Sequence, residues 1–132
     1  MYAQPAVAPF PARSQTIIEL IGDADARLAL SFAETLDRIR SSNDRVVVRL
    51  DRVGLVHADG LADIAETILR ERRAGRDVVV ATGIRRLERL LEAHQVPVTP
   101  PFRPEEGVAQ RHVMLVHRGR DRDVRRPRAA AG

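Results

Sequence analysis

The sequence predicts a single α/β domain with a mostly parallel sheet of four to five strands, covered by four helices. Three observations support this fold class. A length of 132 residues is about that of one domain. Hydrophobic residues make up 44% of the chain and charged residues 30%, which is the balance of a globular protein. Apolar β-branched runs alternate with amphipathic stretches, an order typical of parallel strands joined by helical crossovers.

Three apolar runs predict strands. Residues 15–21 are rich in β-branched side chains and end before Gly22. Residues 45–50 and 77–81 each contain three consecutive valines. Since successive side chains of a strand point to opposite faces, these uninterrupted runs indicate strands that are buried on both faces of the sheet.

Four stretches with apolar residues at helical spacing predict the helices. They begin near residues 26, 61, 83 and 105, and Gly75 suits the left-handed position that ends the second of them. The last one extends to about residue 117 and follows a proline-rich turn. The apolar stripes are formed by Leu28, Phe32, Leu36 and Ile39; Leu61, Ile64, Ala65, Ile68 and Leu69; Leu87, Leu90 and Leu91; and Val108, His112, Leu115 and Val116.

The two ends of the chain differ in composition from the domain, which we place at residues 14–117. Residues 1–13 contain three prolines and four alanines without periodicity, which predicts a disordered leader. Residues 118–132 contain six arginines and two aspartates, which predicts a disordered basic tail. The whole chain has a net charge of +4, and this tail accounts for all of it. Because residues 1–117 are neutral, direct binding of nucleic acid is not expected.

The composition argues against several classes of function. The absence of cysteine excludes disulfides, thiolate zinc sites and cysteine nucleophiles. All 22 basic residues are arginines, so lysine chemistry is excluded too. The sequence has no glycine-rich phosphate loop, no serine in a nucleophile-elbow context, and no apolar run long enough for a transmembrane segment. We therefore expect a cytoplasmic protein that is not an enzyme and needs no cofactor.

Acidic residues and histidines offer few candidates for a metal or catalytic site. His57, Asp59 and Asp63 lie close together in sequence, but a metal site needs three or four convergent ligands, so a solvated loop is the expected role. Asp23 and Asp25 form either a catalytic carboxylate pair or a helix cap. The cap is favoured because Asp25 directly precedes a predicted helix.

Residues 45–76 read RVVVRLDRVGLVHADGLADIAETILRERRAGR and are followed by DVVVATG. A strand that ends in Leu-Asp, a Val-Gly-Leu-Val stretch, and a polar tetrapeptide that leads through Gly-Leu into a helix resemble the STAS domain. This family includes bacterial anti-sigma factor antagonists and the cytoplasmic domains of SulP anion transporters. The resemblance covers about residues 15–117, and its motif positions are Asp51, Gly60 and Leu61.

The resemblance implies a regulatory protein-interaction module whose partner is an anti-sigma factor, a related kinase-like protein or another STAS-associated complex. It places partner binding at His57, Ala58, Asp59, Gly60 and Asp63. In antagonists the residue before the glycine is a Ser or Thr that the partner kinase phosphorylates, and here that position is Asp59. One interpretation is that the Asp59 carboxylate mimics a phosphate. The other is that it only stabilises the start of the helix.

Two alternatives to an antagonist-like module stay open. The first is a detached regulatory domain of the SulP transporter type, which residues 82–96 resemble at least as closely. The second is a STAS protein that binds a nucleotide or lipid, because Arg52, Arg85 and Arg86 follow predicted strand ends, where α/β proteins bind ligands.

Overall fold

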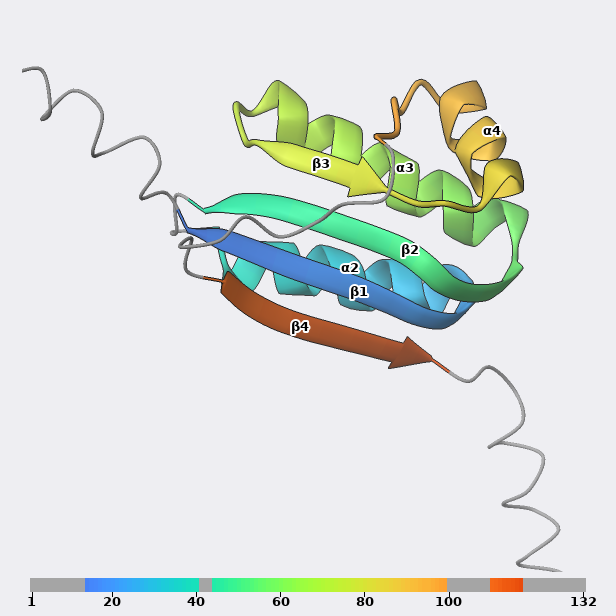
Figure 1. Cartoon of the computed structure of the whole chain (residues 1–132), viewed down its shortest axis with the longest axis horizontal. Helices are drawn as coiled ribbons and strands as arrows, with labels where there is room; N and C mark the ends of the chain where they lie inside the picture. Colours follow the sequence, from blue (N-terminus) through green and yellow to red (C-terminus); the bar gives the residue numbers. More distant parts are fainter. Residues whose placement is uncertain (1–13, 41–43, 100–109, 118–132) are drawn as a thin grey trace, which may run out of the picture.

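Four parallel strands form one sheet in the order β3-β2-β1-β4 (Figure 1). The computed structural model describes residues 14–40, 44–99 and 110–117. The strands are β1 (Gln15–Ala24), β2 (Arg45–Val56), β3 (Val78–Ala81) and β4 (Gln110–His117), and the helices are α2 (Ala26–Arg38), α3 (Ala58–Arg73) and α4 (Arg85–Ala93). The predicted α/β class and parallel sheet are therefore confirmed.

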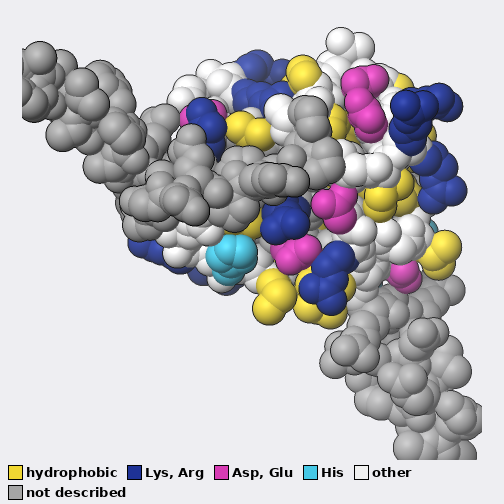
Figure 2. Space-filling model, viewed as in Figure 1, with side chains coloured by type: hydrophobic (Ala, Val, Ile, Leu, Met, Phe, Trp, Pro, Cys, Tyr) yellow, Lys and Arg dark blue, Asp and Glu magenta, His cyan; other side chains and the backbone are white. Residues whose placement is uncertain are grey.

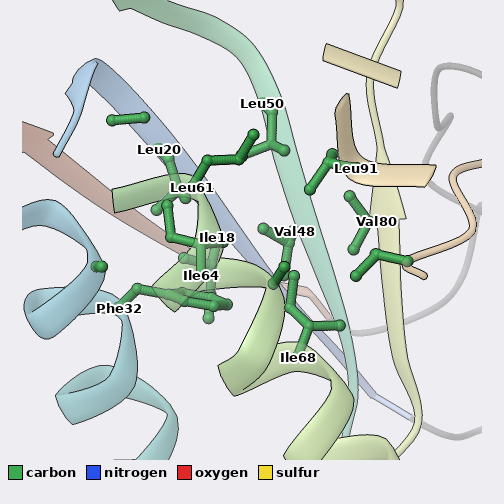
Figure 3. Close-up of a cluster of buried hydrophobic side chains, with 14 of the residues drawn as sticks. Ile18, Leu20, Phe32, Val48, Leu50, Leu61, Ile64, Ile68, Val80 and Leu91 are labelled. Carbon is green, nitrogen blue, oxygen red and sulfur yellow. The ribbon is translucent and has the colours of Figure 1, made fainter. Parts of the chain in front are cut away.

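Helices α2 and α3 lie side by side on one face of the sheet (Figure 1). Their apolar stripes and alternate residues of the strands form the core, and Leu91 of α4 joins the same cluster as Val80 and Leu50 (Figure 3). The most deeply buried large side chains include Phe32, Ile18, Leu20, Val48, Ile64 and Ile68. The helical stripes predicted for α2 and α3 thus pack inward, and so do Leu87 and Leu91 of α4, whereas Leu90 of the same stripe is 37% exposed.

The valine run of β2 is buried on both faces of the sheet, as its pattern predicts. Val46 and Val48 point toward the helices, whereas Val47 points to the opposite face, and all three are 0% exposed. Ile17 of β1 pairs with Val47 and is equally buried. The two central strands therefore contribute buried side chains to both faces of the sheet.

The helix predicted over residues 105–117 is wrong, because residues 110–117 form β4. His112, Leu115 and Val116 have helical spacing, but the same segment also alternates as a strand does. Val113 and Leu115 pack against the core, and all eight residues of β4 pair with β1. The described residues therefore contain three helices rather than four. Residues 110–117 form a strand because they pair with the edge of β1 that β2 leaves free.

The described part of the chain contains no helix that is long and apolar enough to cross a membrane. The predicted leader at residues 1–13, the predicted tail at 118–132, and Val108 of the predicted last helix lie outside the described residues.

A buried ion pair ties α2 to the end of α3. The Glu71 side chain is 5% exposed, and its Oε1 lies 3.2 Å from Nη1 of Arg76, which is 13% exposed. The same guanidinium donates to the carbonyl oxygens of Leu36 and Ile39 at the end of α2, at 3.1 and 2.9 Å. Arg76 thus supplies partners for helix-end carbonyls that have none within their helix.

Candidate functional site

The candidate residues lie near the carboxyl ends of the parallel strands. β1 ends at Ala24, β2 at Val56 and β4 at His117. Ala24 pairs with Val56, and its carbonyl accepts a hydrogen bond from the backbone N–H of His57 at 3.0 Å. This pairing brings the start of α3 next to the start of α2.

Gly60 allows this close approach of the two helix starts. A Cβ atom at Gly60 would lie 2.5 Å from both the Cα and the carbonyl carbon of Asp25, and 2.6 Å from the carbonyl oxygen of Ala24. All three are backbone atoms, so no side-chain rotation relieves the contact. The one residue that matches the family pattern within His57–Gly60 therefore has a steric reason to be glycine in this chain.

Asp51 holds the turn between β3 and α4. Its Oδ1 accepts hydrogen bonds from the backbone N–H of Gly83 at 2.6 Å and from the Thr82 hydroxyl at 3.2 Å. The Thr82 oxygen in turn accepts from the backbone N–H of Ile84 at 3.0 Å. Asp51 therefore positions the entry to α4, and nothing in these contacts makes it a reactive group.

Asp25 is a helix cap, as its sequence position predicts, and it has a second partner. Its Oδ1 accepts from the backbone N–H of Leu28 at 3.0 Å, and its Oδ2 lies 2.7 Å from Nε2 of His117. Burial alone raises the pKa of Asp25, but the Leu28 hydrogen bond and the His117 imidazole stabilise the carboxylate more. The pKa of Asp25 therefore lies below its usual value of 3.8.

We expect replacement of Asp25 by Asn to make stability less dependent on pH. Asn caps a helix about as well as Asp, so the variant loses mainly the charge. A carboxyl group whose pKa is lowered in the folded state stabilises the protein at pH values above its usual pKa. This contribution disappears as the pH falls through the lowered pKa. In urea unfolding, the free energy of unfolding of the wild type should exceed that of Asp25→Asn at pH 7. The two values should converge below about pH 4. A difference that stays constant over this range would contradict the assignment.

The first turn of α3 is open to solvent. His57, Ala58, Asp59 and Asp63 are exposed, whereas Gly60 is buried against Asp25. His57 occupies the N-cap position but makes no side-chain capping bond. Asp59 is therefore an acid of the first turn rather than the cap, and its Oδ1 accepts from the backbone N–H of Gly60 at 2.8 Å.

Leu55 is a surface residue that the sequence pattern does not reveal. Leu55 is 65% exposed and lies near the end of β2, three residues before the start of α3. The pairing of β1 with β2 shifts register between Gly22 and Ala24, opposite the stretch that contains Leu55. Such irregularities change which face a side chain occupies. The sequence indicates this register shift only through Gly54, the residue before Leu55, because a glycine within a strand often marks a bulge.

The geometry gives little support to a metal or a ligand at this edge. Residues 14–40, 44–99 and 110–117 contain no group of three or more His, Asp or Glu side chains that could hold a metal ion. Arg52, Arg85 and Arg86 are exposed beside β2 and α4. Ligands of open α/β sheets bind where the strand order reverses, which here is between β1 and β4. Arg52 lies in β2, and Arg85 and Arg86 lie in α4, so none of the three belongs to β1 or β4.

Comparisons of this chain with protein-family models, with curated proteins and with solved structures find no match.

Proposed function

We propose that this chain is a non-catalytic, cytoplasmic regulatory module of the STAS type that binds a partner protein through the start of α3. The docking surface consists of Leu55, His57, Ala58, Asp59 and Asp63. The observation that carries the proposal is the 65% exposure of Leu55 beside the exposed first turn of α3.

This arrangement has the character of a protein-binding site. An apolar side chain surrounded by polar, solvated groups is the usual layout of an interface, in which a few anchors supply most of the binding energy. The first turn of α3 is held firmly in place, because Gly60 lets this turn pack directly against the backbone of Asp25. The resemblance to STAS domains names the partner class as an ATP-binding anti-sigma factor.

Titration of the full chain with each purified anti-sigma kinase encoded in the same genome tests this function. We expect one of them to bind, and Leu55→Lys to weaken that binding at least tenfold, since a buried anchor contributes more than about 1.4 kcal/mol. Leu90→Lys is the matched control, because Leu90 is also a surface leucine, 37% exposed, but lies on α4. Failure of every kinase to bind, or equal losses for the two variants, would reject the proposal.

We expect the partner kinase to leave the start of α3 unphosphorylated. Residues 53–70 contain a single hydroxyl side chain, Thr67, which is 6% exposed in the middle of α3. Incubation with the kinase and ATP, followed by peptide mass spectrometry, should show no phosphate in residues 53–70. Phosphate there would show that this surface is switched as it is in the antagonists.

Substitutions of Asp59 separate its two interpretations. An acid in the first turn interacts favourably with the helix dipole, so Asp59→Ser and Asp59→Ala should each destabilise the protein by about 0.5 kcal/mol. If the carboxylate only stabilises α3, all three proteins bind the partner equally, which is the result we expect. If it mimics a phosphate that repels the partner, Asp59→Ser binds about tenfold more tightly than wild type. Binding titrations alongside melting curves measure both quantities.

A further inference from the structure

The two edges of the sheet are protected very differently. At one edge β3 is only four residues long, and the backbone N–H of Thr99 donates to the carbonyl oxygen of Val80 at 2.8 Å. At the other edge β4 is eight residues long, and within the described residues it pairs with β1 alone. Natural proteins usually shorten, cover or charge an edge strand to prevent pairing with another chain.

Within the described residues no strand pairs with the outer edge of β4, and this strand carries exposed apolar side chains beside a single arginine, Arg111. Its sequence, QRHVMLVH, has neither proline nor an acidic residue. Met114 is 62% exposed and Val116 is 52% exposed, although both lie in a strand. They lie on the face turned away from α2 and α3, because Val113 and Leu115 are the residues that pack against the core. In the lower part of this face a few hydrophobic side chains lie among arginine, acidic and histidine side chains (Figure 2).

We propose that β4 pairs with β4 of a second copy of this chain, antiparallel, about a two-fold axis at Met114. The two sheets then form one continuous sheet of eight strands. This is an isologous contact, in which the same surface is used by both copies. It removes the open edge of each sheet and buries the exposed Met114 and Val116 side chains of both.

The register about Met114 follows from the side chains of β4. On the outer face Met114 lies opposite its own copy, and Val116 lies opposite the His112 ring. On the helix-covered face Val113 lies opposite Leu115, and both of these are only partly buried by the core. A register about Val113 would instead place Val116 opposite Gln110 and Leu115 opposite Arg111. Cross-strand pairs of apolar side chains stabilise a sheet, so the axis at Met114 is favoured.

The same register gives the exposed Arg111 a polar neighbour. About an axis at Met114, the exposed Arg111 lies opposite His117 of the second copy. Nε2 of His117 is 2.7 Å from the carboxylate of Asp25, so this imidazole is paired with an acidic side chain of its own copy. This contact occurs twice, once on each side of the axis.

Cysteine cross-linking tests the pairing cleanly, because the chain contains no cysteine. In an antiparallel pair the Cα atoms of opposite residues are about 4.5–5.5 Å apart, which a disulfide spans. Under mild oxidation we expect full-length Met114→Cys to form a covalent dimer. Leu55→Cys is the matched control, because its position is 65% exposed but lies on β2. It should remain uncross-linked.

Sedimentation of the full chain supplies the second measurement. We expect wild type to approach twice the monomer mass of 14.7 kDa as its concentration rises, and Val116→Lys to remain at the monomer mass. A wild-type protein that stays monomeric would overturn the proposal, as would equal cross-linking of the two cysteine variants. Leu55→Lys should still dimerise, so failure of the docking surface and failure of the β4 contact are distinguishable.

Discussion

Replacing Glu71 by Ala should lower the free energy of unfolding by about 3–5 kcal/mol, because it removes one partner of a buried ion pair. Arg76 would keep its bonds to the carbonyl oxygens of Leu36 and Ile39 but lose the carboxylate that neutralises its charge. The Arg40 guanidinium, 3.3 Å from the other Glu71 oxygen, would also lose a partner. Such a loss is a large part of the stability of a small domain.

Urea unfolding of Glu71→Ala beside Glu66→Ala measures this contribution. Glu66 belongs to the same helix but is exposed, so its replacement should change stability by no more than about 0.5 kcal/mol. If the two variants unfold at the same urea concentration, Glu71 does not hold α2 and α3 together.

Replacing Gly60 by Ala should destabilise the protein by about 2 kcal/mol, even though alanine is the better helix former by about 1 kcal/mol. The added Cβ would overlap backbone atoms of Ala24 and Asp25, so α3 would have to move away from β1. We expect the same movement to weaken partner binding, because the first turn of α3 carries the proposed docking surface.

Gly54→Ala is the matched control for the Gly60 variant. A Cβ at Gly54 would come no closer than 3.8 Å to any neighbour, which is an ordinary contact. Thermal melting should therefore show a small change for Gly54→Ala and a clear decrease for Gly60→Ala. A Gly60→Ala protein that is as stable as wild type would refute the steric explanation of this glycine.

The elements with a strong local pattern could be predicted from the sequence, and β4 could not. The stripe of α3 has one clear periodicity, and the valine runs of β2 and β3 are uninterrupted; all of these residues except Val79 and Leu69 are buried. Residues 110–117 fit both a helical and a strand pattern. Their state depends on pairing with the free edge of β1, which is a long-range interaction that no local spacing records.

The candidate site was predictable in part for the same reason. The Asp25 cap depends on neighbours three residues away, and sequence reasoning finds it. The contact of Asp25 with His117 joins residues that are far apart in the sequence and appears only in the folded structure. The exposure of Leu55 likewise follows from register shifts between β1 and β2, which side-chain alternation alone does not predict.

The most direct test of the proposed docking surface is an NMR titration of the isotope-labelled full chain with an anti-sigma kinase that is found to bind it. We predict that the largest chemical-shift changes fall on residues 54–63, which include Leu55 and the first turn of α3. Smaller changes should extend to Asp25, on which Gly60 packs. Changes concentrated on β4 or α4, with residues 54–63 unaffected, would contradict the account.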